Sequence, residues 1–340
     1  MPQVMNDRYP DSRSITAFVP EGSGAVRFHR QLATMLPSYC VRSYPSSFEL
    51  APWRMRRLRT GNGELIHSSP DHAIWVTPPD SPLVASFLNY VLDPQMRAYS
   101  TIAQRIHYMT DLRLFTRRAL KRAAAVTAVS NATADLVRSD LGFSGPIHVI
   151  PTSVDSSRFS PLEESAFRAI PRVLFCGTPS YRKGFQWLDA IAKGIGDIAE
   201  LACATGNRAL PAGDHSRLKL LGAILPDTLP ELYRSANVFI LPSVREGMSL
   251  AQLEAMATGL PIVAWRVPSS MELLGDIQGD LLAELGDVDG FTERVRWLLF
   301  NPDRALEIGA RNRALVVRSH QPSDMVNAYA ALFAEVSLAA

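Results

Sequence analysis

Short apolar runs alternate with stretches of helical periodicity along almost the whole chain. In the first half, the expected strands are Ile15–Val19, Leu65–His67, Val84–Phe87, Val126–Val129 and His148–Ile150. In the second half, they are Val173–Cys176, Leu201–Ala204, Leu218–Leu221, Val238–Leu241 and Ile262–Ala264. Apolar runs of this length, separated by helical segments, are typical of parallel sheets with crossover helices.

The segments between these strands carry helical patterns. Helices are expected at Val26–Leu36, Phe185–Ile191, Leu229–Ser235, Ala251–Ala257, Phe291–Phe300 and Met325–Val336. A further helix is expected to run from an N-cap at Ser130 to Leu141 and to close at Gly142, because serine caps helix starts and glycine favours the left-handed residue at helix ends.

The pattern stops in the Ser- and Pro-rich segment Pro151–Ile170, which contains a Glu163–Glu164 pair, and then begins again. This restart predicts an α/β protein with two Rossmann-like, doubly wound domains, one over residues 1–155 and one over 156–322. A C-terminal helix over 323–340 is expected to pack back on the first domain. Ligands of such folds bind in the crevice outside the carboxyl ends of the strands.

Composition supports a globular protein and excludes several other classes. A length of 340 residues favours two domains, and 47% hydrophobic with 20% charged residues is ordinary for a folded chain. A net charge of +2 is too small to indicate nucleic acid as a partner. The scattered Cys40, Cys176 and Cys203 suggest neither a disulfide framework nor a metal site, and no apolar run or signal sequence predicts insertion in a membrane. We therefore expect a cytoplasmic protein, soluble or peripheral to a membrane.

The strongest chemical signal follows the strand Val238–Leu241. The loop Pro242–Gly247 leads into a helix that begins near Ser249, whose first turn offers unpaired backbone N–H groups and the positive end of the helix dipole. Gly247 allows the backbone to approach a ligand closely. These features predict a diphosphate site.

Two carboxylates flank this helix start. Glu246 lies in the loop, and Glu254 lies about one turn inside the helix, where it can accept hydrogen bonds from a ribose diol. The pair is therefore placed to contact two parts of one nucleotide-sugar. A second interpretation stays open, in which both are solvated acids that the helix dipole favours.

Several motifs together resemble glycosyltransferase family 4, the retaining enzymes with the GT-B fold. The segment from Glu246 to Val263, with Glu254-Ala255-Met256-Ala257 inside it, resembles the family's Glu-x7-Glu segment. Cys176-Gly177 followed by Arg182-Lys183-Gly184 resembles its strand and Lys-Gly turn. Val129-Ser130-Asn131 and Ile150-Pro151-Thr152-Ser153-Val154-Asp155 with Phe159 resemble its inter-domain signatures, and Glu272-Leu273-Leu274 resembles its Glu-hydrophobic pair. The resemblance is dense from Ala125 to Asn301.

The resemblance implies a role for each matching residue. Lys183, with Arg182 beside it, would neutralise the donor diphosphate as it leaves, and Glu246 would contact the donor sugar. The remaining donor-binding positions would be Gly22, Ser23, Gly24, Gly177, Thr178, Gly247, Met248, Ser249, Leu250, Glu254 and Glu272. Alternative interpretations are a solvated turn lysine at Lys183, an ordinary strand-to-helix turn at Gly22–Gly24, and a structural helix-start acid at Glu272.

Two positions depart from the family pattern. An arginine usually follows the glycine of the first donor-domain strand, whereas this chain has Thr178 there, and Arg182 is the candidate substitute. A histidine is usual at the end of one acceptor-domain strand, whereas our alignment places Leu88 there. These departures bring the donor sugar and the rate of catalysis into question.

Basic and acidic clusters add two expectations about partners. The helical cluster Arg113, Arg117, Arg118, Lys121 and Arg122 is suited to an anionic membrane surface, although a solvated helix face explains it as well. Arg54, Arg56, Arg57 and Arg59 form a second basic group. Asp287-Val288-Asp289 is expected to supply acids at a helix start, and no metal or other cofactor is expected.

The sequence thus predicts a retaining, metal-independent hexosyltransferase that uses a nucleoside-diphosphate sugar. Its acceptor would be a saccharide, a lipid-linked sugar or a small molecule, in the synthesis of envelope polysaccharide or a glycoconjugate. A silent nucleotide-sugar-binding protein on the same fold and a GT-B-type sugar-nucleotide epimerase are the alternatives. The sequence does not identify the base, the sugar, the acceptor or the oligomeric state.

Overall fold

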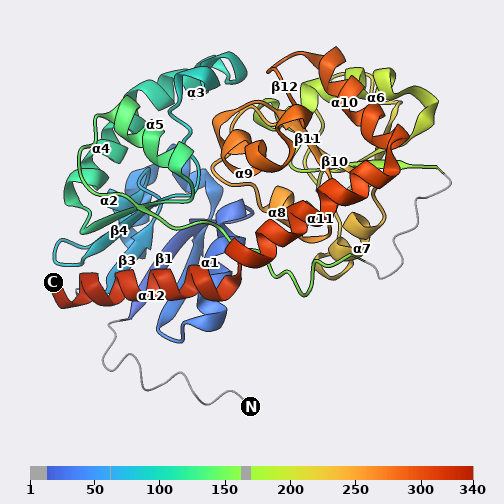
Figure 1. The fold of residues 1–340 in the computed structure, drawn as a ribbon. Coiled ribbons are helices and arrows are strands. Elements are labelled where there is room, and N and C mark those ends of the chain that lie inside the picture. The colour runs from blue at the N-terminus through green and yellow to red at the C-terminus, as the bar shows by residue number, and fades with distance from the viewer. Residues whose placement is uncertain (1–13, 62, 162–169, 340) are drawn as a thin grey trace. The chain divides into compact units, whose positions relative to one another are not determined.

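A computed structural model describes residues 14–61, 63–161 and 170–339 of the chain. The described residues divide into two compact units (Figure 1). The first contains the residues up to Asp93, Thr101–Thr152 and the C-terminal segment from Pro322, and the second contains Pro94–Ser100 and Ser153–Gln321. The segment 94–100 therefore belongs to the second unit, although its neighbours in the sequence belong to the first.

The first unit is built on a six-stranded sheet with the order β2-β1-β3-β4-β5-β6, in which all paired strands are parallel. Its strands are β1 (Ile15–Pro20), β2 (Tyr39–Tyr44), β3 (Leu65–Ser68), β4 (Leu83–Phe87), β5 (Ala125–Ala128) and β6 (His148–Val149). Its α-helices are α1 (Gly24–Met35), α2 (Ala73–Val76), α3 (Ile102–His107), α4 (Arg113–Arg122), α5 (Asn131–Leu141) and α12 (Pro322–Ala339). Side chains of α12 such as Tyr329 and Phe333 pack in one hydrophobic cluster with Ile15 and Leu65 of the sheet.

The second unit has another parallel six-stranded sheet, with the order β12-β11-β10-β7-β8-β9. Its strands are β7 (Arg172–Cys176), β8 (Glu200–Ala204), β9 (Leu218–Leu220), β10 (Val238–Leu241), β11 (Ile262–Trp265) and β12 (Leu282–Ala283). Its α-helices are α6 (Leu188–Ile195), α7 (Leu229–Arg234), α8 (Leu250–Ala257), α9 (Pro268–Gln278), α10 (Val288–Phe300) and α11 (Pro302–Ser319).

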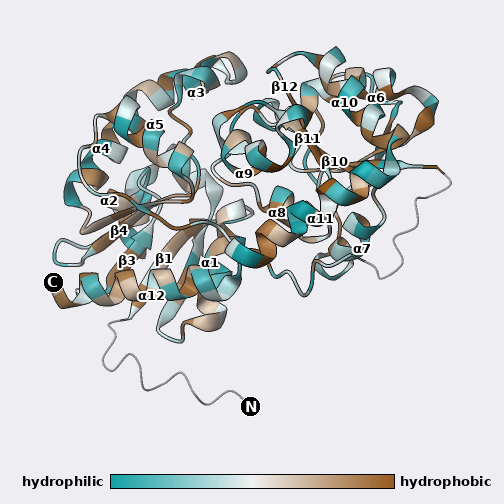
Figure 2. Cartoon of the chain, viewed as in Figure 1, coloured by the Kyte–Doolittle hydropathy of each residue, from teal (hydrophilic) through white to brown (hydrophobic). Residues whose placement is uncertain are grey.

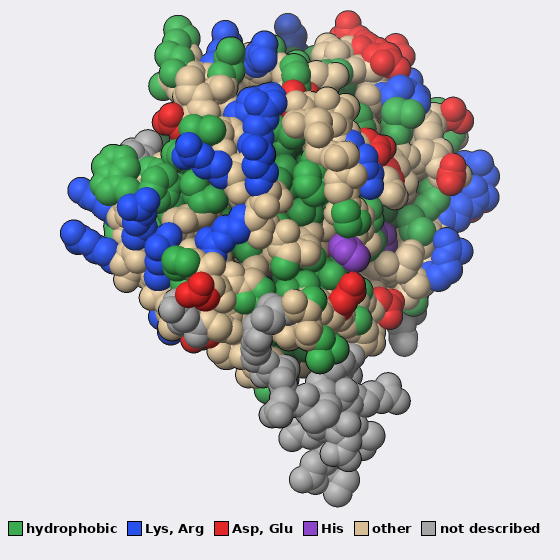
Figure 3. All heavy atoms as spheres, turned by 90° about the vertical axis from the view of Figure 1, so that its left-hand side faces the viewer, with side chains coloured by type: hydrophobic (Ala, Val, Ile, Leu, Met, Phe, Trp, Pro, Cys, Tyr) green, Lys and Arg blue, Asp and Glu red, His purple; other side chains and the backbone are tan. Residues whose placement is uncertain are grey.

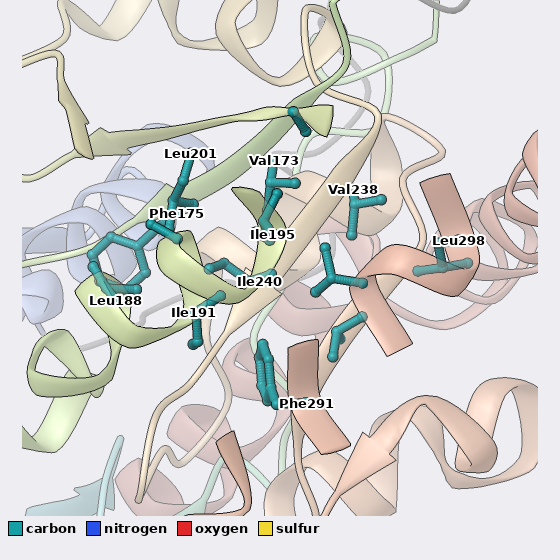
Figure 4. Packing of buried hydrophobic residues seen from close by; sticks show 14 of the residues in the cluster. Val173, Phe175, Leu188, Ile191, Ile195, Leu201, Val238, Ile240, Phe291 and Leu298 are labelled. Carbon is teal, nitrogen blue, oxygen red and sulfur yellow. The ribbon is translucent and has the colours of Figure 1, made fainter. Parts of the chain in front are cut away.

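Both faces of the second sheet are buried, because successive side chains of its strands point to opposite faces and helices pack against each of them. Val173 and Phe175 of β7 pack in a cluster with α6 and α10, as Figure 4 shows, whereas Leu174 between them packs in the cluster that includes α8. Strands hidden on both faces are continuously apolar, and Figure 2 shows hydrophobic colour along β10 and β11. This explains why apolar runs were sufficient to locate these strands.

The structure confirms the predicted α/β architecture and most predicted elements. Ser130 caps α5 by accepting from the backbone N–H of Thr133, and Gly142 closes this helix with φ +65°, both as expected. The sequence analysis missed the edge strand β2, of which only the end residues Tyr39 and Tyr44 are buried, and the helices α9 and α11. Part of the expected linker, 162–169 with the Glu163–Glu164 pair, lies outside the described residues.

The helix predicted at Phe185–Ile191 begins differently. Residues Phe185–Trp187 form a 3-10 turn, η6, and the α-helix α6 starts only at Leu188. Gly184, which precedes the turn, is left-handed, so it lies outside the helix. None of the described helices has the length and apolarity that crossing a membrane requires.

Candidate functional site

The candidate site of the second unit lies at the carboxyl ends of β7 and β10. These two strands are parallel neighbours, so the loops that follow them emerge at the same edge of the sheet. The loop after β7 contains the short 3-10 turn η5 (Tyr181–Lys183), and the loop after β10 leads to α8. The two loops bring the adjacent Arg182 and Lys183 together with Glu246, which is far from them in the sequence.

Gly184 allows the two loops to pack closely. Its φ is +78°, and a Cβ atom built on it would lie 1.8 Å from the carbonyl oxygen of Pro242. A backbone hydrogen bond of 2.9 Å, from the N–H of Val244 to the carbonyl oxygen of Arg182, fixes the same contact. Any side chain at position 184 would therefore push the lysine-bearing turn away from β10.

Two cationic side chains of the η5 turn contact the carboxylate of Glu246. The Nζ of Lys183 lies 2.6 Å from its Oε1, and Nη1 of Arg182 lies 3.2 Å from the same oxygen. The side chains of Lys183 and Glu246 are only 15% and 10% exposed. Because two cationic side chains face one carboxylate, the cluster has an excess of one positive charge. This charge lies largely out of contact with solvent.

The electrostatics of Glu246 reflect this arrangement. Burial raises the pKa of its carboxyl, but the charges of Lys183 and Arg182 and the hydrogen bond from Lys183 lower it more. Its pKa therefore lies below the ordinary value, and the carboxylate is ionised at neutral pH. The ionised carboxylate of Glu246 therefore holds both cationic side chains in the cluster.

The helix α8 begins directly after this cluster. Its N-cap, Ser249, is 3% exposed and makes no side-chain cap hydrogen bond. The Oγ of Ser249 and the Nε2 of the buried Gln252 have no hydrogen-bond partner within the described part of the chain. A buried polar atom without a partner is costly, so these two groups and the positive end of the helix dipole together favour an anionic ligand.

Glu254 lies one turn further along α8 and is 1% exposed. Its Oε2 accepts a hydrogen bond of 2.8 Å from the hydroxyl of the buried Tyr233 in α7. Burial, and then the nearby Cys176 and Glu254, raise the pKa of Tyr233, so its hydroxyl remains protonated and donates. The carboxylate is not a solvated first-turn acid, which excludes that interpretation for Glu254.

Other predicted residues occupy the loops around the cluster or lie apart from it. Gly247, Met248 and Leu250 continue the backbone from Glu246 into α8, and Gly177 and Thr178 form the start of the turn after β7. The Cβ position of Gly177 lies 3.7 Å from Cδ of Lys183. Glu272 is an exposed residue in the first half of α9.

The residues predicted in the first half belong to the first unit. Gly22 has φ +70° in the turn after β1, Ser23 is the N-cap of α1, and Gly24 is its first residue. The Oγ of Ser23 donates to the carbonyl oxygen of Pro20 at 2.8 Å, an interaction internal to the turn. Leu88, which occupies the position of the family's histidine, packs against the hydrophobic cluster of β1 and α12.

Two further predictions concern charged clusters. Asp287 is the N-cap of α10 and accepts from the N–H of Gly290 at 3.0 Å, as expected for an acid at a helix start. The basic helix is less uniform than predicted, because Arg113 binds Asp140 at 2.7 Å and Arg122 donates to backbone carbonyls of 77–79 and 81. Arg117, Arg118 and Lys121 are exposed.

The sequence analysis missed Tyr233, Gln95 and Arg245 as neighbours of the site. Tyr233 holds Glu254, and Nη2 of Arg245 donates to Oε1 of Gln95 at 3.1 Å. Arg245 could have been noticed, since it precedes Glu246 in the motif. No pattern in the sequence places the segment of Gln95 beside it.

Comparisons with known proteins agree with this geometry. The family model for glycosyltransferase family 4 matches residues 14–158, and the model for glycosyl transferases group 1 matches residues 170–301. The 2-deoxystreptamine glucosyltransferase of Streptomyces kanamyceticus is 27% identical over 208 residues, 55% of this chain and 54% of that protein. The MMP alpha-(1->4)-mannosyltransferase of Mycolicibacterium hassiacum is 30% identical over 221 residues, 60% of this chain and 53% of that protein. The chain thus spans about half the length of these relatives.

Solved structures support the fold. Sucrose-phosphate synthase from Thermosynechococcus elongatus superposes with a TM-score of 0.81 at 18% identity, covering 96% of this chain and 100% of that one. Anabaena HepE in complex with UDP-glucose gives a TM-score of 0.73 at 16% identity, covering 96% of this chain and 100% of that one. Since these likenesses show the GT-B fold and the two family models together match both halves, the chain belongs to glycosyltransferase family 4, the glycosyl transferases group 1.

Proposed function

We propose that this protein is a retaining glycosyltransferase that moves a hexose from a nucleoside-diphosphate sugar to an acceptor. The observation that carries the proposal is the contact of Lys183 and Arg182 with the single carboxylate of Glu246 beside the start of α8. This excess of positive charge, next to the unpartnered Oγ of Ser249, suits a diphosphate.

In the proposed reaction, the bond between the sugar's anomeric carbon and the diphosphate oxygen breaks as the acceptor oxygen attacks. Negative charge then grows on the diphosphate, where the ammonium of Lys183 and the helix start stabilise it. Retention follows if the leaving phosphate accepts the proton of the acceptor hydroxyl on the same face of the sugar. Because two cations and a helix dipole are available, no divalent metal is required in this scheme.

In this proposal, each residue of the donor site contacts a different part of the nucleotide-sugar. Glu254, held by Tyr233, would accept hydrogen bonds from the ribose hydroxyls, and Glu246 would face the donor sugar. Gly247, Met248, Ser249 and Leu250 would present backbone N–H groups to the phosphates. Gly177, Thr178 and Glu272 would complete the donor side, and Gly22, Ser23 and Gly24 of the first unit remain predicted donor-binding residues.

The names of the relatives suggest which donor sugar to test. HepE has been solved with UDP-glucose, and other relatives are named for glucosyl or mannosyl transfer, so UDP-glucose and GDP-mannose are the first donors to test. A saccharide, a lipid-linked sugar or a small molecule is the proposed class of acceptor. These substrates would suit a cytoplasmic enzyme in the synthesis of an envelope polysaccharide or a glycoconjugate, and we include this role in the proposal.

The competing function is a silent nucleotide-sugar-binding protein, favoured by Thr178 and Leu88 at two positions where the family usually has arginine and histidine. A test separates the two. The protein is titrated calorimetrically with UDP and GDP, and then incubated with UDP-glucose and GDP-mannose with and without EDTA while released nucleotide is measured. Binding with sugar transfer or donor hydrolysis supports the enzyme, binding alone supports the silent protein, and no binding contradicts both. An altered sugar on an intact nucleotide would indicate an epimerase.

Peripheral attachment to a membrane is a further part of the proposal, supported by the surface of the first unit. Ile102, Ile106 and Met109 are 74%, 60% and 56% exposed, and they recur at helical spacing along α3 and the π-helical turn that follows it. The exposed Arg117, Arg118 and Lys121 lie further along the continuous helical segment. Figure 3 shows Lys and Arg side chains gathered among hydrophobic ones on this side of the molecule. Such a combination suits an anionic lipid surface.

A further inference from the structure

The segment Pro94–Ser100 is an unusual part of the second unit. It follows β4 in the sequence and is followed by α3, and both of these elements belong to the first unit. The 3-10 helix η3 (Pro94–Tyr99) nevertheless packs against η5, the turn that carries Lys183. A piece of the first half of the sequence is therefore part of the surroundings of the candidate donor site.

Two side chains of η3 contact the loops of that site. The ring of Tyr99 meets the ring of Trp187 edge to face, with centroids 5.8 Å apart, just after the Lys-Gly turn. The Oε1 of Gln95 accepts a hydrogen bond of 3.1 Å from Nη2 of Arg245 in the loop after β10. Thus η3 touches both of the loops that form the cluster.

Arg245 transmits this contact to the neighbouring carboxylate. Arg245 is only 2% exposed and Gln95 is exposed, so the bond between them is part-buried; because its donor is charged, it is stronger than a bond between neutral groups. The carbonyl oxygen of Arg245 accepts from Nη1 of Arg182 at 3.1 Å, and the same Nη1 lies 3.2 Å from Oε1 of Glu246. Arg182 therefore binds the loop after β10 at two points, the carbonyl of Arg245 and the carboxylate of Glu246. If the side chain of Arg245 shifted, the loop would move, and both of these contacts would change.

We propose that Gln95 is a positioning residue of the donor site. By accepting from Arg245, it anchors the loop 243–247 so that Glu246 remains between Lys183 and Arg182. This inference rests on the proposed function, because it predicts an effect on nucleotide binding. It assigns to the segment 94–100 a function on the donor side, although the flanking sequence belongs to the unit expected to bind the acceptor.

The test uses the full-length protein with matched variants. Gln95→Met keeps the length of the side chain but removes the acceptor, whereas Gln95→Glu keeps an acceptor for Arg245. Gln31→Met, on α1 in the first unit, is the control for replacing a glutamine by methionine. Binding of UDP and GDP is measured by calorimetry, KM and kcat are measured with the donor that proves active, and thermal melting checks that each variant folds.

We expect Gln95→Met to weaken nucleotide binding about 10-fold, the effect of roughly 1.4 kcal/mol from a hydrogen bond to a charged group. The loss should appear mainly in KM for the donor. Gln95→Glu should stay within about threefold of the wild type, and Gln31→Met should match it. The inference is overturned if Gln95→Met binds like the wild type, or if Gln95→Met and Gln95→Glu lose affinity equally. Failure of the wild type to bind any nucleotide would instead contradict the proposed function itself, and the inference with it.

Discussion

The Nζ of Lys183 lies 2.6 Å from Oε1 of Glu246, although 62 residues separate them in the chain. The contact exists because β7 and β10 are parallel neighbours and because Gly184 permits the turn after β7 to lie against Pro242. The carboxylate of Glu246 holds the ammonium of Lys183 beside the loop that leads into α8. A diphosphate would then meet a lysine that needs little reorganisation, which favours charge stabilisation during bond cleavage.

Replacement of this lysine should remove most of the activity. Lys183→Ala is expected to lower turnover roughly 10²-fold or more, because the charge that stabilises the leaving diphosphate is lost. Lys193→Ala, at an exposed position on α6, provides the control and should leave turnover unchanged. Released nucleoside diphosphate is the measured quantity. Turnover near the wild-type value in Lys183→Ala would show that the diphosphate binds elsewhere.

The glycine after this lysine should be essential for stability as well as for activity. Gly142 and Gly184 are both left-handed, but only a Cβ atom at Gly184 would meet other atoms, at 1.8 Å from the oxygen of Pro242. Gly142→Ala should therefore cost only the conformational penalty, about 1–2 kcal/mol. Gly184→Ala should cost about 1–3 kcal/mol more, because the two loops must separate. Urea unfolding of both variants tests this difference, and equal losses would contradict it.

Much of this site could be predicted from the sequence because its motifs are local. Lys183-Gly184 and the segment from Glu246 to Glu254 each lie in one loop and the helix that follows it. The apolar runs of β7 and β10 are continuous because both faces of the sheet are buried, which made the strands easy to locate. Their adjacency then brings the two motifs together.

The remaining features depend on packing between distant segments. The bond between Gln95 and Arg245 spans 150 residues, and neither residue lies in a pattern that points to the other. The edge strand β2 was missed for a different reason, since only its end residues Tyr39 and Tyr44 are buried and no apolar run marks it. Exposed strand centres have little hydrophobic signal, so their location is set by neighbouring strands instead of by their own sequence.

Glu254 supplies a test of how the nucleotide is oriented. If its carboxylate accepts from the ribose hydroxyls, UDP and GDP should bind more tightly than their 2′-deoxy counterparts. Glu254→Gln keeps the shape of the side chain but removes the charge, so it should weaken nucleotide binding and reduce this discrimination, each by roughly 10-fold. Glu293→Gln, at an exposed position on α10 outside the proposed donor site, gives the comparison. If Glu254→Gln keeps full discrimination, the ribose is not bound by this carboxylate.

The first unit contains a chain of buried polar groups that reaches from α1 to α12. Tyr39 Oη lies 2.6 Å from Nδ1 of His29 and 2.5 Å from Nδ1 of His67. From Nε2 of His67 the chain continues at 2.6 Å to Ser86, at 2.6 Å to Thr127 and then at 3.1 Å to Tyr329. Neutral imidazoles are sufficient to fill every link of this chain, because a neutral imidazole donates through one ring nitrogen and accepts through the other.

Acid should therefore destabilise this unit. Burial lowers the pKa of His29 to about 3, and burial together with the nearby His29 lowers that of His67 well below its ordinary value. In the unfolded chain both rings take up protons near pH 6.5, so the free energy of unfolding should fall as the pH drops from 6.5 toward 3. Two such groups give a slope of up to about 3 kcal/mol per pH unit.

A substitution that mimics one ring nitrogen isolates this effect. His29→Asn keeps a polar group near the position of Nδ1 but does not titrate, so the loss of stability between pH 6.5 and pH 4.5 should be smaller than in the wild type. His148→Asn at an exposed position should leave the loss unchanged. Urea unfolding at each pH is the measurement. A pH dependence identical to that of the wild type in His29→Asn would show that the buried ring is not its source.

The exposed surface of α3 predicts how the protein should behave with lipids. If Ile102, Ile106 and Met109 enter an anionic bilayer surface, the protein should sediment with phosphatidylglycerol-containing vesicles and only weakly with phosphatidylcholine vesicles. Ile106→Glu should reduce this binding at least about 10-fold, because it replaces buried apolar area by a charge repelled by the lipid. Leu225 of the second unit, which is 71% exposed against 60% for Ile106, gives the control Leu225→Glu, which should bind as the wild type does. Binding that is insensitive to Ile106→Glu, or equal on neutral and anionic vesicles, would contradict attachment through this surface.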